Sequence, residues 1–584
     1  MRCTKPVLQP LPKIFNACYM ITSLPIPEPL PPDLHQQTKP VQLLQGLQVL
    51  QLCADAEFLN HWEHLYQHCP WATVFQSPAF ACTWYRHYHT AYQPILVLAT
   101  QDEQLTGLLA LAQDKRGNLV AAGASQAEYQ VWLSSEEHAE SFINEALTTL
   151  RQAFPHQDIH LEYVPAGTPL AWAQDPNGWG AYCISKTARQ PLMRLDQEKI
   201  AKELKKKNRR EKINRLKRAG NLSFEKITTG HTFRNVLDEL AVQSDFRKGA
   251  MYNKCVFQED PNRKTFLQDL FRQGLLHATL LKVDQHIVAS NVGVIGNNWL
   301  HLQGLNTHSP FFAKHSPGIL HFLMLSSMLA EEGMAVFDLT PGANPYKDLL
   351  ATDYTEATTL TIYSEKRLRK AKLKYKVNTI LKQQLPKIGL EKHTIGGYKQ
   401  QAQMLKEKAL ILQKTGAAPL LQLARQSIQA PYKYKHYALP LPPAAAASPV
   451  ELQRDSLADL LRYTPGNSLT CRWEFLMEAM KRFELGQHCY TWTANDRLLG
   501  WAWLADAKAL QAEGIPGAAI LENGVALHSV QVPSSAAAAL SDFIRAVAAE
   551  AGKDSPSQAC LFISQNRQQE KALLQLGASK LRQV

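Results

Sequence analysis

The spacing of hydrophobic residues changes along the chain, and each change predicts a helix or a strand. Over residues 75–89 apolar side chains recur every three or four positions, with Ser77 as a helix N-cap and Pro78 at the first helical position, which predicts a helix. The apolar stretch 94–112 is interrupted by a polar turn at its centre, which predicts a two-stranded hairpin. A helix and a further strand are expected before residue 165.

A second region repeats this order of elements. Three apolar stretches between residues 277 and 306 are separated by two-residue polar turns, which predicts an antiparallel meander. A helix opened by Ser316 and Pro317 is expected to end at Gly333, and an apolar strand over 334–340 follows it. The repetition predicts two tandem units, and similar patterns near the C-terminus predict a third.

We therefore predict a mixed α/β (α+β) fold in which mostly antiparallel sheets are flanked by helices. Changes in composition mark the boundaries between the units. The predicted organisation is a disordered Pro-rich leader (1–44), an N-terminal unit (45–190), a central unit (191–362), a basic helical arm (363–430), a linker (431–449) and a C-terminal unit (450–584).

Composition narrows the class of protein and its compartment. No run of about 18 apolar residues occurs in the sequence, so no membrane-spanning helix is predicted. The first forty residues contain nine prolines and no continuous apolar stretch, unlike a secretory signal peptide. The ten cysteines are scattered without a C-x-x-C pair, which favours the reducing cytoplasm. His61, His64 and His68 share one helix face, but no H-E-x-x-H motif completes them, so we predict no metal site.

The net charge of +12 comes from two short basic stretches. Residues 199–218 carry eleven lysines and arginines and two glutamates, and residues 366–376 carry seven basic residues and no acid, which leaves the rest of the chain at −4. Concentrated positive charge favours an anionic ligand or a membrane surface nearby, although a solvated helix face explains it equally well. The first stretch lacks interleaved aromatic residues, so sequence-specific RNA recognition is not indicated.

The chemically informative stretch is the meander, loop, helix and strand over residues 277–340. A helix that begins soon after a strand offers unpaired backbone N–H groups and the positive end of its dipole, which suit a phosphate or pyrophosphate. Pro317 removes one of these donors, and Gly318 lets a ligand approach the backbone closely. We therefore expect a phosphate-bearing ligand at the start of this helix.

Residues 296–347 resemble the core of the GNAT-fold acetyltransferases, in the branch that contains CelD-type and FemAB-like proteins. The resemblance covers about 195–350, extends to the N-terminal unit through 75–78 and the hairpin at Gly107, and reaches the C-terminal unit through Gly500. The matching features of the central unit are the strand after Asn297 and Asn298, the loop Ser316, Pro317 and Gly318, Gly333, the strand with Phe337 and Asp338, the pair Tyr346 and Lys347, the basic helix before Gly220 and the segment 246–249.

This resemblance implies tandem GNAT-like domains that transfer an acyl group from acetyl-CoA or another acyl-CoA to an amine or hydroxyl. In GNAT proteins the pantetheine arm of the carrier lies between two splayed strands, which here would be 299–306 and 334–340. The cofactor-binding residues that it implies are Ser316, Gly318 and Ile319. Only one glycine of the usual pyrophosphate loop is present, so an aminoacyl-tRNA, as in the FemAB relatives, is the alternative carrier.

The transfer needs a base for the acceptor's proton and an acid for the leaving thiolate. Asp338 is our leading base, and the alternative for it is a helix cap or a partner for Lys347. His301 is the second candidate, set against ordinary packing in a strand. Tyr346 is the candidate acid, set against a core position. The residues predicted to bind an anionic acceptor are Arg247, Lys248 and Lys347.

Three functions stay open from the sequence. The first is an acyl-CoA-dependent acyltransferase acting on a cell-envelope or exopolysaccharide precursor, the second is an aminoacyl-tRNA-dependent transferase, and the third is a non-catalytic scaffold. The C-terminal unit reads VPSSAAAALSDF where a phosphate would bind, so we predict a degenerate copy used for docking or acceptor selection. Walker A, G-x-S-x-G and dinucleotide motifs do not occur, which disfavours nucleotide hydrolysis and serine hydrolase chemistry.

Overall fold

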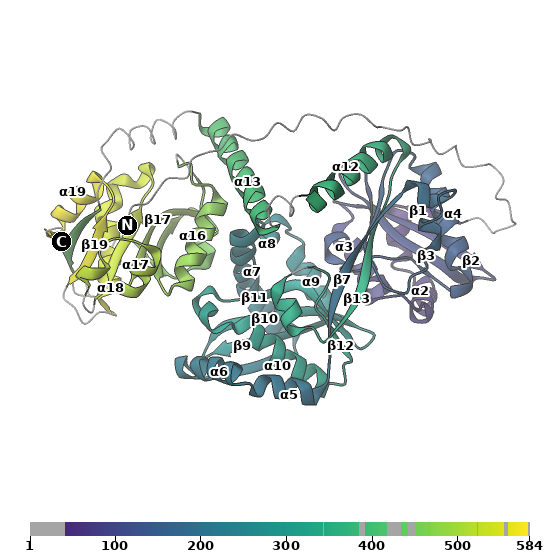
Figure 1. The fold of residues 1–584 in the computed structure, drawn as a ribbon, viewed down its shortest axis with the longest axis horizontal. Coiled ribbons are helices and arrows are strands. Elements are labelled where there is room, and N and C mark those ends of the chain that lie inside the picture. Colours follow the sequence, from purple (N-terminus) through teal and green to yellow (C-terminus); the bar gives the residue numbers. More distant parts are fainter. Residues whose placement is uncertain are drawn as a thin grey trace.

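The protein folds into three lobes in a computed structural model (Figure 1). The residues that the structure describes are 41–342, 344–384, 392–416, 434–441, 450–465, 468–521, 524–553 and 559–581. Most of the predicted leader, residues 1–40, lies outside the described residues. The predicted leader ended too late, because residues 42–45 form a strand that pairs with the hairpin of the N-terminal half.

The first lobe, which we call the N-terminal half, contains the helix and the hairpin that the sequence predicts. The Ser77 side chain accepts a hydrogen bond from the Phe80 N–H at the predicted N-cap, and the hairpin turns at Asp102 and Glu103, both with positive φ. Its strands are β1 (Gln42–Gln45), β2 (Gln93–Gln101), β3 (Gln104–Gln113), β4 (Leu119–Ala121), β5 (Leu133–Ser134) and β6 (Ile159–Val164). Its helices are α1 (Leu47–Leu52), α2 (Ala56–His68), α3 (Pro78–Tyr88) and α4 (Ala139–Ala153).

The second lobe, which we call the central half, contains the predicted meander, helix and strand. Its strands are β7 (Cys183–Arg194), β8 (Leu222–Ile227), β9 (Leu276–Val283), β10 (His286–Gly296), β11 (Trp299–His308), β12 (Val336–Asp338) and β13 (Asp353–Ile362). Its helices are α5 (Gln197–Lys205), α6 (Lys207–Ala219), α7 (Gly230–Tyr252), α8 (Val256–Glu259), α9 (Arg263–Arg272), α10 (Pro317–Glu331) and α11 (Pro345–Leu350).

Two long strands join the two halves into one sheet. Strands β7 and β13 pair antiparallel over the whole length of β13, while β13 also pairs with β6 and β7 also pairs with β12. The sheet order is β1-β2-β3-β4-β6-β13-β7-β12-β11-β10-β9-β8, with β5 on β3. The predicted boundary between residues 190 and 191 is therefore wrong, because it falls inside β7. In addition, β6 of the N-terminal half pairs with β13, a strand of the central half.

The third lobe has its own sheet, in the order β15-β16-β17-β18-β19-β14-β20. Strand β14 (Lys435–Pro440) lies in the predicted linker 431–449 and pairs with β19 and β20, so that prediction is wrong for these residues. The other strands are β15 (Gln453–Arg454), β16 (His488–Ala494), β17 (Arg497–Ala505), β18 (Ala526–Gln531), β19 (Ala559–Ser564) and β20 (Ser579–Lys580). The helices are α15 (Leu457–Leu460), α16 (Arg472–Glu484), α17 (Ala507–Glu513), α18 (Leu540–Lys553) and α19 (Arg567–Gln575).

One topology occurs three times along the chain. In each lobe antiparallel strands lead through a helix to a strand that runs parallel to the last of them, namely β4 with β6, β11 with β12 and β18 with β19. The predicted mixed α/β fold with mostly antiparallel sheets and flanking helices is confirmed.

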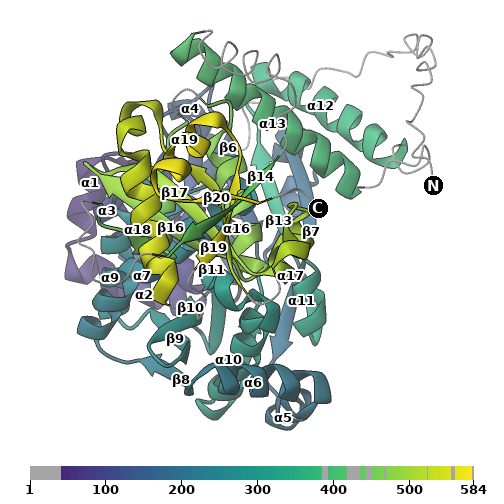
Figure 2. The ribbon, with the colours of Figure 1, turned by 90° about the vertical axis from the view of Figure 1, so that its left-hand side faces the viewer.

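The two basic stretches lie at opposite ends of the molecule (Figures 1 and 2). The first was predicted as one helix, but it breaks at Lys206 into α5 and α6, because Ile200 and Leu216 pack into different hydrophobic clusters. The second lies on α12 (Glu365–Gln384), which is followed by α13 (Lys392–Thr415). Among the described helices, none combines the length and the hydropathy that a membrane crossing requires.

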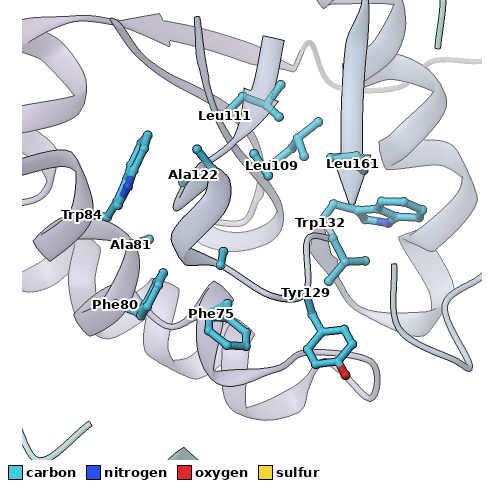
Figure 3. Close-up of a cluster of buried hydrophobic side chains, with 14 of the residues drawn as sticks. Phe75, Phe80, Ala81, Trp84, Leu109, Leu111, Ala122, Tyr129, Trp132 and Leu161 are labelled. Atoms are coloured by element: carbon cyan, nitrogen blue, oxygen red, sulfur yellow. The ribbon is translucent and has the colours of Figure 1, made fainter. Parts of the chain in front are cut away.

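Aromatic side chains fill the core of the N-terminal half (Figure 3). Trp84, Phe75 and Trp132 are fully buried. Helix α4 packs so closely on the sheet that a Cβ on Gly107 would overlap the ring of Phe142 on this helix. The loop that contains Gln130 fills the space beside the parallel pair of β4 and β6, where the Gln130 amide accepts a hydrogen bond from the Glu162 N–H (2.8 Å). The buried Gln130 therefore occupies the edge of β6 beyond its pairing with β4.

We expect the pairing of β13 to contribute strongly to stability. Leu360 on β13 is fully buried, so Leu360→Ala should lower the free energy of unfolding by about 2–5 kcal/mol, because it leaves a cavity in the shared sheet. The matched control is Leu349→Ala, which removes a side chain that is 60% exposed and should change stability by less than about 0.5 kcal/mol. Urea denaturation measures both, and equal effects would contradict a central role for β13.

Candidate active site

Strands β11 and β12 separate after a short pairing. The paired residues are Trp299 with Val336, Leu300 with Phe337 and His301 with Asp338. Strand β12 ends at Asp338, whereas β11 continues to His308 and is paired there only with β10. The register of β10 against β11 shifts between Val292 and Val294, which marks a β-bulge at the point of separation. The two strands predicted to splay therefore do so.

A cavity of about 460 Å³ lies at this opening. Its walls come from the free end of β11, from the start of α10 and from single residues of α7, α11 and α16. The predicted residues among its lining are Ser316, Gly318, Ile319, Arg247 and Tyr346. The other lining residues are Ser290, Asn306, Thr307, His308, Ala313, Lys314, His321, Phe322 and Glu484.

The start of α10 is open toward the cavity and surrounded by positive charge. Ser316 is the N-cap in a left-handed conformation (φ 51°), and its side chain makes no capping hydrogen bond; its Oγ instead accepts one from Lys212 Nζ on α6 (2.8 Å). A Cβ on Gly318 would lie 3.5 Å from His308 Nδ1, an ordinary van der Waals contact, so there is room for about one methyl group between this glycine and β11. Burial and the nearby charges of Lys314, Arg215 and Lys212 lower the pKa of His315.

Several buried polar atoms of the cavity have no protein partner. Within the described residues, Ser290 Oγ, Thr307 Oγ1, His321 Nδ1 and Arg247 Nε lack a hydrogen bond. Burial lowers the pKa of His321 and of His308 to about 3, so both imidazoles are neutral at physiological pH. Buried polar groups are rarely left unsatisfied, and such a convergence indicates a polar ligand.

The cavity takes its lining from both faces of the sheet. His321 on α10 contacts Thr279 (3.1 Å), and strand pairing places Asn291 and Asn306 on the same face. Side chains alternate along a strand, so the pair Ser290 and Thr307 points to the opposite face, where α7 presents Arg247. Two ligands on opposite faces can therefore meet at the opening.

Asp338 and His301 come together, but away from the cavity. Asp338 is fully buried and accepts hydrogen bonds from the Tyr129 hydroxyl (2.6 Å) and from the Thr340 N–H (2.9 Å), and His301 Nδ1 lies 2.8 Å from its Oδ2. Neither residue lines the cavity. The prediction that Asp338 faces the cleft is wrong, because the loop of the N-terminal half that carries Tyr129 packs over this end of β12.

The two predicted lysines also lie elsewhere. Lys347 Nζ is buried and donates to the carbonyl oxygens of Thr340 and Pro341 and to the Thr340 hydroxyl, so it holds the turn after β12. Lys248 follows Arg247 on α7 and does not line the cavity; burial and Arg263 lower its pKa to about 8. Of the three residues predicted to bind an acceptor, only Arg247 lines the cavity.

Two carboxylates near the site were not anticipated. Glu484 reaches the cavity from the third lobe, and Glu128 lies beside Asp338 in the loop of the N-terminal half. Burial and the charge of Asp338 raise the pKa of Glu128 to about 7, while Lys347 partly opposes this shift. Neither glutamate belongs to a local motif, and both are more than one hundred residues from α10 in the sequence, so no sequence signal identified them.

The described residues contain no group of three His, Cys, Asp or Glu side chains that could hold a metal ion. The groups that the cavity offers are hydroxyl, imidazole, guanidinium, ammonium and carboxylate side chains and a helix start. Such a set binds phosphate-bearing and polar organic molecules and can move protons, which suits group transfer between two bound substrates.

The shifted pKa of Glu128 predicts a pH-dependent stability. The folded protein holds this proton up to about pH 7 and the unfolded chain only to about 4.5, so the contribution of Glu128 is lost as the pH rises through this window. Glu128→Gln should therefore gain stability relative to the wild type between pH 5 and pH 8, on the order of 1–3 kcal/mol. Urea denaturation at both pH values measures this, with the exposed Glu137→Gln as control. A difference that does not vary with pH would contradict the assignment.

Comparison with known proteins agrees with this geometry. Residues 204–348 match the family model described as acetyltransferase (GNAT) domain. The matched stretch runs from the end of α5 into α11 and contains the splayed strands and the start of α10. No curated protein matches the sequence significantly.

The solved structures that match this chain do so at low sequence identity and with low TM-scores. FemX is 9% identical, with 53% of this chain and 96% of FemX covered and a TM-score of 0.39. The C-terminal domain of a putative lysylphosphatidylglycerol synthetase from Agrobacterium fabrum is 15% identical, with 56% and 96% covered and a TM-score of 0.36. A tandem GNAT protein from the clavulanic acid biosynthesis pathway is 14% identical, with 56% and 98% covered and a TM-score of 0.34. These similarities are too distant to assign an activity.

The family match and the splayed strands agree on one conclusion. Residues 204–348 of the central unit match the model of the acetyltransferase (GNAT) domain family, and this stretch contains the splayed strands β11 and β12.

Proposed function

We propose that the central unit transfers an acyl group from acyl-CoA to an amine or hydroxyl acceptor. The observation that carries this proposal is the cavity at the opening between β11 and β12, because it joins a basic helix start to buried polar atoms without partners. The predicted cofactor-binding residues Ser316, Gly318 and Ile319 all line it. The further prediction of a cell-envelope or exopolysaccharide acceptor stays a prediction.

The residues at the start of α10 fit the carrier. Lys212, Lys314 and the first N–H groups of α10 would hold the pyrophosphate, since a helix start and ammonium groups are good phosphate ligands. Among the described strands, none pairs with the edge of β11 that faces away from β10 beyond His301, so this edge presents backbone N–H and C=O groups. Those groups would bind the amides of the pantetheine arm. Bound acyl-CoA supplies the activated thioester.

Tyr346 is the residue that we propose as the acid. In the transfer, the acceptor nitrogen or oxygen bonds to the thioester carbon, the C–S bond breaks, and the thiolate takes a proton. Tyr346 lines the cavity, and burial raises its pKa to about 12, so its hydroxyl is protonated and available as a donor at neutral pH. The proton of the acceptor leaves on the α7 side, where Glu484 and solvent lie.

An aminoacyl-tRNA is the second candidate carrier. The observation that favours it is the position of α6, whose Lys212 contacts Ser316 at the cavity. Arg209 of this helix is buried, and its exposed basic residues are Lys207, Arg210, Arg215, Lys217 and Arg218. An exposed basic helix beside the site can bind RNA phosphates, and such binding weakens steeply with salt.

Loss of Lys212 should weaken acyl-CoA binding. A charge-assisted hydrogen bond to phosphate contributes about 1.5–3 kcal/mol, so Lys212→Ala should raise the Kd for acetyl-CoA about tenfold or more. Isothermal titration at two salt concentrations measures the Kd. Lys217→Ala removes an exposed lysine of the same helix and should leave the Kd within about twofold.

Two outcomes would contradict the acyl-CoA proposal. If both variants bind acetyl-CoA as the wild type does, the pyrophosphate does not lie at the start of α10. If the wild type binds charged tRNA with a steep salt dependence and does not bind acetyl-CoA, the second candidate replaces the first.

Tyr346→Phe should lower kcat with little change in KM. Removing a positioned proton donor costs about 100-fold or more in rate, while the phenylalanine ring keeps the packing against Phe322. Thiol release from acetyl-CoA in the presence of a panel of amines and alcohols measures the rate. Tyr354→Phe, on β13 and outside the cavity, is the control. A rate that is unchanged in Tyr346→Phe would remove this residue from the mechanism.

A further inference from the structure

The third lobe is docked against the helix that forms one wall of the cavity. Helix α16 packs on α7, where the Trp473 indole N–H donates to the carbonyl oxygen of Ala250 (2.9 Å). A Cβ on Gly249 would lie 2.9 Å from a methyl carbon of Leu476, so glycine permits this close helix contact. Side chains of both helices share one hydrophobic cluster, which includes Phe246 and Phe483. The third lobe therefore has a fixed position relative to the cavity.

This docking places a charged residue of the third lobe at the cavity. Glu484 is the last residue of α16 and follows Phe483, whose ring packs edge-on against Phe311 in the loop before α10 (4.7 Å between centroids). Phe311 and Phe483 thus fix the end of α16 beside the opening. Among the described residues that line the cavity, Glu484 is the only carboxylate.

Arg247 is the cation of the cavity wall whose charge acts on this carboxylate. Its Nε is buried and lacks a hydrogen-bond partner within the described residues, so its capacity to bind an anion is not used up. Burial raises the pKa of Glu484, and the charge of Arg247 opposes that shift; both side chains line the same cavity. Arg247 lies on α7 and Glu484 on α16, which packs on α7.

We propose that the third lobe provides acceptor recognition, with Glu484 binding the ammonium group and Arg247 the anionic group of a small primary amine that also carries a phosphate or a carboxylate. This inference rests on the proposed acyl transfer and names its acceptor class. One positive and one negative group on the protein match one negative and one positive group on the ligand, and each charge then has a partner in a partly desolvated site. Plain amines and plain anions satisfy only one of the two.

Matched pairs of ligands test the two contacts separately. The probes are phosphoethanolamine against 2-hydroxyethyl phosphate, and β-alanine against 3-hydroxypropionate, which differ only in amine or hydroxyl; ethanolamine tests the amine alone. We expect the full chain, saturated with CoA, to bind at least one of the two amines about tenfold more tightly than its hydroxyl partner and than ethanolamine. Isothermal titration measures the affinities.

Substitutions assign the contacts. Glu484→Gln should abolish the preference for amine over hydroxyl, and Arg247→Gln should abolish the preference for the anionic amine over ethanolamine, while Arg247→Lys should restore part of it. Glu478→Gln is the control, because Glu478 lies on the same helix and does not line the cavity. Thermal unfolding identifies any variant that does not fold, and in that case Arg247→Lys carries the test of that position.

The outcomes separate this inference from the proposed function. Equal binding of amine and hydroxyl probes by the wild type, or an unchanged preference in Glu484→Gln, overturns the inference and leaves acetyl-CoA binding untouched. A wild type that does not bind acetyl-CoA overturns the proposed function, and the preference for an anionic amine then shows whether the pocket still recognises such ligands. If Glu484 and Arg247 only pair with each other and hold the lobes together, the wild type would bind the amine and hydroxyl probes equally.

Discussion

The antiparallel pairing of β7 with β13 is the constraint on which the rest of the structure depends. These two strands carry one sheet from the N-terminal half into the central half, and their other edges hold β6 and β12. Because β12 is fixed to β7 and is only three residues long, it ends beside the beginning of β11, so the rest of β11 is paired on its other side with β10 and has no described strand on this side. The opening of the site follows from this short strand.

The two halves use the same topology for different purposes. In the N-terminal half the loop around Gln130 and Tyr129 fills the space beside the parallel pair, and its Tyr129 reaches across to Asp338. The buried carboxylate therefore fixes the position of β12 relative to the other half. In the central half the equivalent space stays open and is lined by polar atoms. The N-terminal half therefore supports β12, whereas the central half leaves space for ligands.

Local patterns predicted the elements and one end of the site, but not the contacts between distant segments. The cap at Ser77, the meander and the start of α10 at Ser316 depend on neighbouring residues, and the sequence identified them. The prediction that Asp338 faces the cleft is wrong, because the alternation of side chains along a strand does not show which face of that strand another lobe covers. The sharing of strands between halves, and the arrival of Glu484 from α16, depend on pairings across many residues, which periodicity does not encode.

The exchange of strands has a consequence for dissecting the molecule. A fragment that stops near residue 190 would keep β6 but lose β13, and the complementary fragment would keep β13 but lose most of β7. Each piece would then expose a long strand edge whose backbone groups seek a new partner, which is the usual route to aggregation and domain swapping. We therefore expect the first two lobes to fold as one unit, because they share a single sheet.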